Sequence, residues 1–172
     1  MQLKGIAEGV LSDRQIGEMI DIGHICSEQT IEGGQIQPAS LDLRLGEKAY
    51  RLRASFLPGK AAKVSERLGE FKMHEMDLRS GAVLEKGCVY VVPLLESLDL
   101  PIEISGAASA KSSIGRLDLL TRVITDDGVE FDRVPSGYTG PLFVEICPRS
   151  FSVLVRFGHM LTQIIFRLGQ TI

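Results

Sequence analysis

Short runs rich in β-branched and aromatic residues, separated by turn-forming residues, recur along most of this chain and limit the folds open to it. Along 41–45, leucines alternate with Asp42 and Arg44, which is the period of two that a strand requires. Glycine and proline interrupt the runs, as at Pro58-Gly59 and Pro135-Ser136-Gly137. Comparable runs occupy 87–92, 142–147, 152–157 and 161–166. Many short strands with turn signals predict a mainly β protein, an antiparallel sandwich or barrel.

One short helix is expected near the N-terminus. Ser12 followed by Gln15 fits a capping box, in which each side chain bonds a free backbone N–H of the first turn. Gly23 is suited to end the helix in the left-handed region, where a missing Cβ removes the steric cost. The apolar face of the N-terminal helix would consist of Ile16, Met19 and Ile20.

The stretch 57–70 fits either a long loop or a helix with charged residues on its exposed face.

Length and charge limit the classes of function. The 172 residues, 44% of them hydrophobic, suffice for a single domain over 1–172, with an N-terminal helical segment (1–34) and a barrel core (35–167). A net charge of −3 argues against a protein that coats a nucleic-acid polymer. Three scattered cysteines favour a reducing compartment, and no apolar run approaches the ~20 residues of a membrane span. We therefore expect a cytoplasmic protein without a membrane partner.

The histidines and cysteines do not form a recognisable zinc motif. Zinc sites need several nitrogen, sulfur or carboxylate ligands that converge on one ion. His24, His74 and His159 have no H-x-x-x-H or H-x-E spacing, and Cys147 belongs to no C-x-x-C pair. The zinc-deaminase signature, H-x-E with P-C-x-x-C, is also absent from the sequence. We expect a protein without zinc or any other resident metal.

Two segments carry candidate site residues. In KSSIGR (111–116), two hydroxyls, a lysine and an arginine fit an anion site, although the segment taken alone favours an N-cap at Ser112 or Ser113 followed by one helical turn. In PLFVEICP (141–148), Glu145 lies within an apolar strand. It is either a buried carboxylate that needs a charge partner or an outward-facing glutamate on a half-solvated sheet. A buried carboxylate is also what general acid–base chemistry uses.

Four segments in this order resemble the dCTP deaminase family of the deaminase and dUTPase superfamily. They are QIQPASLDLRLG (35–46), KSSIGRLDL (111–119), RVPSGYTGPLFVEI (133–146) and LVRFGHMLTQIIF (154–166). The resemblance implies a distorted antiparallel β-barrel or jelly roll of the dUTPase type. It also implies a homotrimer with active sites between subunits, which hydrolyses dCTP to dUTP and ammonia without zinc. Such an enzyme is a hydrolase of cyclic amidine C–N bonds, and its Mg²⁺ is bound through the nucleotide triphosphate.

The resemblance also implies roles for individual residues. Glu145, Ser112 and Arg116 align with the catalytic positions, Glu145 as the group that activates water for attack at C4 of cytosine. Proton transfer by one carboxylate supplies ~10²–10⁴-fold, and fixed donors from Ser112 and Arg116 would stabilise the developing charge. The implied substrate-binding residues are Lys111, Ser112, Ser113, Ile114, Gly115, Arg116, Arg133, Tyr138, Phe143 and Val144.

Departures from the family pattern leave alternatives open. Pro135 stands where the family usually has a sugar-contacting aspartate, and TDDGVE (125–130) reads as an insertion. No counterpart of the family's closing C-terminal segment follows Ile172, so we expect the N-terminal half of a longer two-domain protein. Tyr138 fits a sugar contact or an ordinary strand start, and Asp42 a structural pair with an arginine. A dUTPase, a bifunctional deaminase-dUTPase and a non-catalytic nucleotide-binding trimer module remain alternatives.

Overall fold

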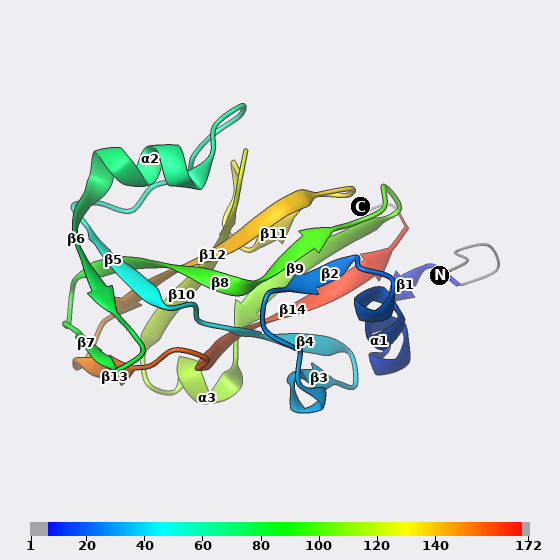
Figure 1. Cartoon of the computed structure of the whole chain (residues 1–172), viewed down its shortest axis with the longest axis horizontal. Coiled ribbons are helices and arrows are strands. Elements are labelled where there is room, and N and C mark those ends of the chain that lie inside the picture. The colour runs from blue at the N-terminus through cyan, green and yellow to red at the C-terminus, as the bar shows by residue number, and fades with distance from the viewer. Residues whose placement is uncertain (1–6, 170–172) are drawn as a thin grey trace.

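A computed structural model of the chain describes residues 7–169, in which antiparallel strands dominate (Figure 1). In this part of the chain, one six-stranded sheet runs β11 (Arg133–Val134), β9 (Ile104–Ala110), β14 (Met160–Leu168), β4 (Ser40–Arg44) and β3 (Ile36–Gln37), with β1 (Gly9–Val10) on β14. The second runs β10 (Leu119–Thr125), β12 (Thr139–Pro148), β8 (Val89–Asp99), β5 (Lys48–Leu52) and β6 (Lys72–Asp77), with β2 (Ile25–Ser27) on β8. A small sheet pairs β13 (Val153–Val155) with β7 (Ala82–Leu84).

The main hydrophobic core lies between the two large sheets. Leu43 and Phe166 enter it from the first sheet, and Val92 and Val144 enter it from the second; all four are fully buried. A single bridge from Leu45 to Leu94 of β8 joins the two sheets just beyond the end of β4. The predicted mainly β, antiparallel fold class is confirmed. The strands at 89–99 and 139–148 are longer than the predicted runs, because β8 continues past Pro93 and pairs there with the first residues of β12 and with β2.

The predicted N-terminal helix is confirmed as α1 (Asp13–Asp21). Both bonds of the capping box at its start are present, with Ser12 N–H donating to Gln15 Oε1 at 2.9 Å. Ile16 and Met19 are buried against the barrel, as their spacing indicates. The chain leaves the helix through Gly23, whose φ of +84° is a conformation that favours glycine.

The ambiguous stretch at 57–70 is divided between a loop and a helix, α2 (Val64–Phe71). A second, smaller core forms here, because Phe56 and Leu68 pack onto Val91 and Phe143 of the second sheet. The rings of Phe56 and Phe71 stack with centroids 5.1 Å apart. The segment 53–71 therefore covers the face of this sheet that points away from the main core, which α2 overlies in Figure 1.

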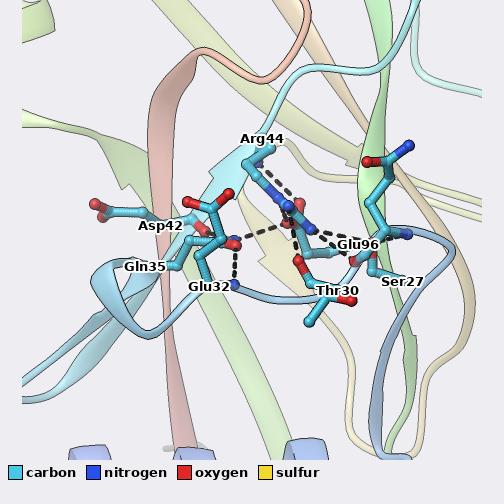
Figure 2. A network of polar contacts seen from close by, with 8 residues as sticks. Ser27, Thr30, Glu32, Gln35, Asp42, Arg44 and Glu96 are labelled. Carbon is cyan, nitrogen blue, oxygen red and sulfur yellow. Dashed lines mark hydrogen bonds and ion pairs between the residues drawn. The ribbon is translucent and has the colours of Figure 1, made fainter.

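A buried polar network fastens the N-terminal segment to the barrel (Figure 2). Arg44 Nε donates to Glu96 Oε1 at 2.8 Å, and Gln35 Nε2 donates to the same oxygen at 2.8 Å. Gln35 ends the 3₁₀ turn η1 (Gly33–Gln35) and also reaches the carbonyl of Asp42. The guanidinium group of Arg44 further donates to the carbonyls of Gln29 and Thr30. Strand β4 is thus covered on both faces.

Candidate active site

The Glu145 carboxylate is buried, and both of its oxygens accept hydrogen bonds. Its strand β12 pairs with β10 so that Arg122 lies directly opposite, and Glu145 is only 1% exposed. Arg122 donates to Oε1 from Nη2 at 2.5 Å and from Nε at 3.2 Å. The Ser55 hydroxyl donates to Oε2 at 2.5 Å. Of the two interpretations of this glutamate, the buried and charge-paired one is confirmed.

The neighbouring strands and loops explain how this cluster forms. Residues directly opposite in a sheet share a face, and the row Tyr50, Val91, Glu145, Arg122 crosses β5, β8, β12 and β10. The Arg122 guanidinium stacks over the ring of Phe131, 3.8 Å from its centroid, which is a cation–π contact. Phe131 lies directly after the TDDGVE stretch (125–130), whose interpretation as an insertion stays a prediction. Sequence reasoning missed both Arg122 and Ser55.

The KSSIGR segment forms a single turn of helix, α3 (Ser112–Gly115). Its N-cap is Lys111, and neither serine caps it, so the N-cap interpretation of the hydroxyls is wrong. Ser112, Ser113 and Arg116 are exposed, and within 7–169 their side chains make no hydrogen bonds. They are therefore available to a ligand or a neighbouring molecule, and their proposed roles stay predictions.

Lys111 is held by a carboxylate from the first sheet. Its Nζ lies 2.5 Å from Oδ2 of Asp42, which is 2% exposed. The arginine partner expected for Asp42 is wrong, because Arg44 on the same strand turns to Glu96 instead. A phosphate ligand at Lys111 would have to share the ammonium with Asp42.

Within the described chain, α3 and the Glu145 cluster are separate. The hydrogen-bond partners of Glu145 in residues 7–169 are Ser55 and Arg122, and Ser112 and Arg116 are not among them. Figure 1 shows α3 on the side of the molecule opposite α2, which overlies the sheet that carries Glu145. One copy therefore does not assemble the predicted catalytic set, and the interfacial site implied by the resemblance stays a prediction.

A pocket of about 320 Å³ lies beside the predicted turn at Pro135-Ser136-Gly137. Arg133 and Pro135 line it, together with Lys60 from the loop before α2. Thr125 also lines it, is 1% exposed, and has an Oγ1 without a hydrogen-bond partner among the described residues. The lining thus holds two cationic side chains, the buried Thr125 hydroxyl and two acidic side chains, Asp127 and Glu130, of which Glu130 lies 3.6 Å from Arg133. Of the predicted binding residues, Arg133 is the one that it contains.

The remaining predicted binding residues on and before β12 are packed inside the protein. Tyr138 is 8% exposed, and its hydroxyl donates to the carbonyl of Pro141 at 2.6 Å and accepts from the N–H of Asp126. Burial raises the pKa of the Tyr138 phenol to about 12. These contacts match the interpretation in which Tyr138 is an ordinary residue at the start of a strand. Phe143 and Val144 are 7% and 0% exposed, so their side chains serve the cores.

The described residues also bear on metals and membranes. Among residues 7–169, no three histidine, cysteine, aspartate or glutamate side chains gather where they could hold a metal ion. None of the helices in that range is both long and apolar enough to cross a bilayer.

Fold and site together define a mainly β, antiparallel protein with an arginine-paired glutamate buried under a loop-and-helix cover. Residues 7–170 match the N-terminal domain of 2'-deoxycytidine 5'-triphosphate deaminase (DCD), and the chain belongs to this family. The crystal structure of that deaminase from Agrobacterium tumefaciens superposes with a TM-score of 0.93 at 54% identity, covering 95% of this chain and 49% of that one.

Two curated relatives extend the comparison. A dUMP-forming dCTP deaminase of Corynebacterium glutamicum is 33% identical over 115 residues, which cover 65% of this chain and 58% of the relative. A dUMP-forming dCTP deaminase of Methanoculleus marisnigri is 30% identical over 164 residues, covering 91% and 79%. The chain thus spans 49% of the Agrobacterium chain and 58% of the Corynebacterium protein.

Proposed function

We propose that this chain takes part in the hydrolytic deamination of dCTP, with Glu145 as the group that moves the protons. The observation that carries the proposal is the buried Glu145 carboxylate, ion-paired with Arg122 on the strand where the family places its glutamate. Membership of the family supports it, as do relatives that are named dCTP deaminases. The substrate is dCTP with Mg²⁺ on its triphosphate, and the protein itself contributes no zinc.

The proposed reaction moves both protons of the attacking water. Water attacks C4 of cytosine as one of its protons passes to N3; the hydroxyl now on C4 then gives up its proton to the amine, the C4–N bond breaks, and ammonia leaves as the C4 carbonyl forms. An ionised Glu145 accepts the proton from water and passes it on. A hydrogen bond through Ser55 occupies Oε2 in this structure, so the carboxylate exchanges that donor for water when substrate arrives.

The exposed side chains of α3 complete the proposed site from a second copy. Ser112 and Arg116 are unoccupied donors on the surface, and Arg116 suits an anion or a developing negative charge. A homotrimer with interfacial sites would bring them to Glu145 of a neighbour. Light scattering of the purified chain tests this, with a mass three times that of the monomer as the expected result.

The nucleotide product distinguishes two candidate functions. Deamination alone gives dUTP and ammonia, which we take as the primary proposal. Relatives named dUMP-forming favour a second candidate, in which dUMP is the product from dCTP. Pro135, in the place of the sugar-contacting aspartate, counts against cleavage of dUTP alone.

One assay tests these functions. Purified protein is incubated with dCTP and Mg²⁺, and ammonia and nucleotides are measured over time. Ammonia with dUTP supports the primary proposal, whereas ammonia with dUMP supports the second. Glu145→Gln removes the titrating carboxylate and is expected to abolish turnover, while Arg14→Ala, an exposed change on α1, serves as the control. Normal dCTP turnover by Glu145→Gln would rule out the mechanism, and binding of dCTP without turnover by the wild type would indicate a binding module.

A further inference from the structure

Arg122 is the residue that fixes where the Glu145 carboxylate points. Two of its nitrogens donate to Oε1, and Nη2 also donates to the Ser55 hydroxyl at 3.0 Å. Ser55 closes the triangle by donating to Oε2. Both carboxylate oxygens are therefore held from two directions, by a strand neighbour and by the segment before α2.

The guanidinium group is itself held in place. The Phe131 ring lies against its face, 3.8 Å from the carbon at its centre, so the plane of the fork is set by packing. A planar fork that is fixed in this way delivers its donors in a defined direction, which a flexible ammonium group does not. The other groups near the cluster are Cys147, two residues along the same strand and face, and Asp132, whose carboxylate accepts from the Val123 N–H on the strand of Arg122.

We propose that Arg122 is a positioning residue for the deamination. This inference rests on the proposed function, because it assumes that Glu145 moves protons at cytosine. Misplacing a catalytic group by about 1 Å can cost ~10²-fold in rate. Loss of Arg122 is therefore expected to lower kcat while leaving the affinity for dCTP nearly unchanged, since the residue acts through Glu145.

The partly open position of Arg122 permits a direct test. Its side chain is 30% exposed, so Arg122→Ala leaves a solvent-connected space between Phe131 and Glu145. Guanidinium ion from solution fits that space and restores both the charge and the planar donors. Two compounds serve as controls for this rescue. Urea has a planar shape similar to that of guanidinium but no charge, and sodium chloride supplies ions without planar hydrogen-bond donors.

The experiment measures kcat and KM for dCTP in the wild-type chain, Arg122→Ala, Arg122→Lys and Arg14→Ala. We expect Arg122→Ala to lose ~10²-fold in kcat with KM within about threefold of wild type. Guanidinium chloride at tens of millimolar is expected to recover at least tenfold, and equal urea or sodium chloride to recover none. Arg122→Lys keeps the charge without the fork and is expected to lose about tenfold in kcat.

The outcomes separate this inference from the function on which it rests. A wild-type chain without dCTP turnover contradicts the proposed function. An active wild type with unchanged kcat in Arg122→Ala, a loss confined to KM, or a loss that guanidinium does not reverse overturns the role of Arg122. If Arg122→Ala does not fold, Arg122→Lys decides, and wild-type kcat in that variant overturns the proposal.

Discussion

The substitution Glu96→Ala tests whether the buried polar network holds the N-terminal segment to the barrel. The Glu96 side chain is 0% exposed and that of Arg44 is 8% exposed. Three donors converge on the carboxylate: Arg44 Nε and Gln35 Nε2 on Oε1, and the Arg44 backbone N–H on Oε2. Its removal leaves all three buried near a cation that has lost its counter-charge.

The expected loss is large for one substitution. Breaking a buried ion pair by removing one partner costs about 3–5 kcal/mol, because the remaining charge stays buried. Arg44 keeps its hydrogen bonds to the carbonyls of Gln29 and Thr30 in the variant. Because these bonds still stabilise its charge, we expect the loss of unfolding free energy to stay within that range. For a chain of this length each kcal/mol lowers Tm by about 2–4 °C, so Tm is expected to fall by roughly 6–20 °C.

Urea and thermal unfolding measure this loss at one fixed protein concentration, because assembly would make Tm depend on concentration. Glu18→Ala removes an exposed partner of Arg14 on α1 and is the matched control, with an expected change below about 0.5 kcal/mol. The double variant Arg44→Met with Glu96→Leu removes both charges and keeps apolar volume. It is expected to recover at least half of the loss. A cost below about 1 kcal/mol for Glu96→Ala would show that the network does not hold the N-terminal segment to the barrel.

Three further results are expected from the same structure. Asp42→Asn takes the buried counter-charge from Lys111 and is expected to lower the free energy of unfolding by about 1–3 kcal/mol in urea. The Tyr138 phenol, with its pKa of about 12, is expected to stay protonated past pH 11 by tyrosinate absorbance; its stabilising effect is complete below pH 10 and declines as pH rises toward 12. Gly46→Ala would place a Cβ 2.5 Å from the carbonyl oxygen of Pro93, so a loss of about 1–3 kcal/mol in thermal unfolding is expected, and a neutral effect would contradict that close approach.

Local patterns predicted the elements whose cause is local. The capping box at Ser12 and the spacing of Ile16 and Met19 predicted α1, because each depends on neighbours within one or two turns. Period-two runs and turn residues predicted the β strands and their antiparallel class. The burial of Glu145 was one of two open interpretations, because an apolar strand does not reveal which of its faces is covered.

Local patterns did not predict which residues pair with the site residues. Ser55 lies 90 residues before Glu145, and Asp42 lies 69 residues before Lys111. No spacing rule connects such pairs, so the arginine expected for Asp42 was wrong and Ser55 was missed. The serines of KSSIGR were likewise ambiguous, because a cap depends on the backbone at Lys111 and not on the hydroxyls alone.

Hydrophobic period and capping act over a few residues, so the class of fold, the N-terminal helix and the strand that carries Glu145 were predictable from local patterns. The pairing of cations with carboxylates depends on the folded chain: Arg122 meets Glu145, Lys111 meets Asp42, and Arg44 meets Glu96. A buried charge pairs with the group that strand register and the covering segments bring within hydrogen-bond distance, and both of these are properties of the whole fold.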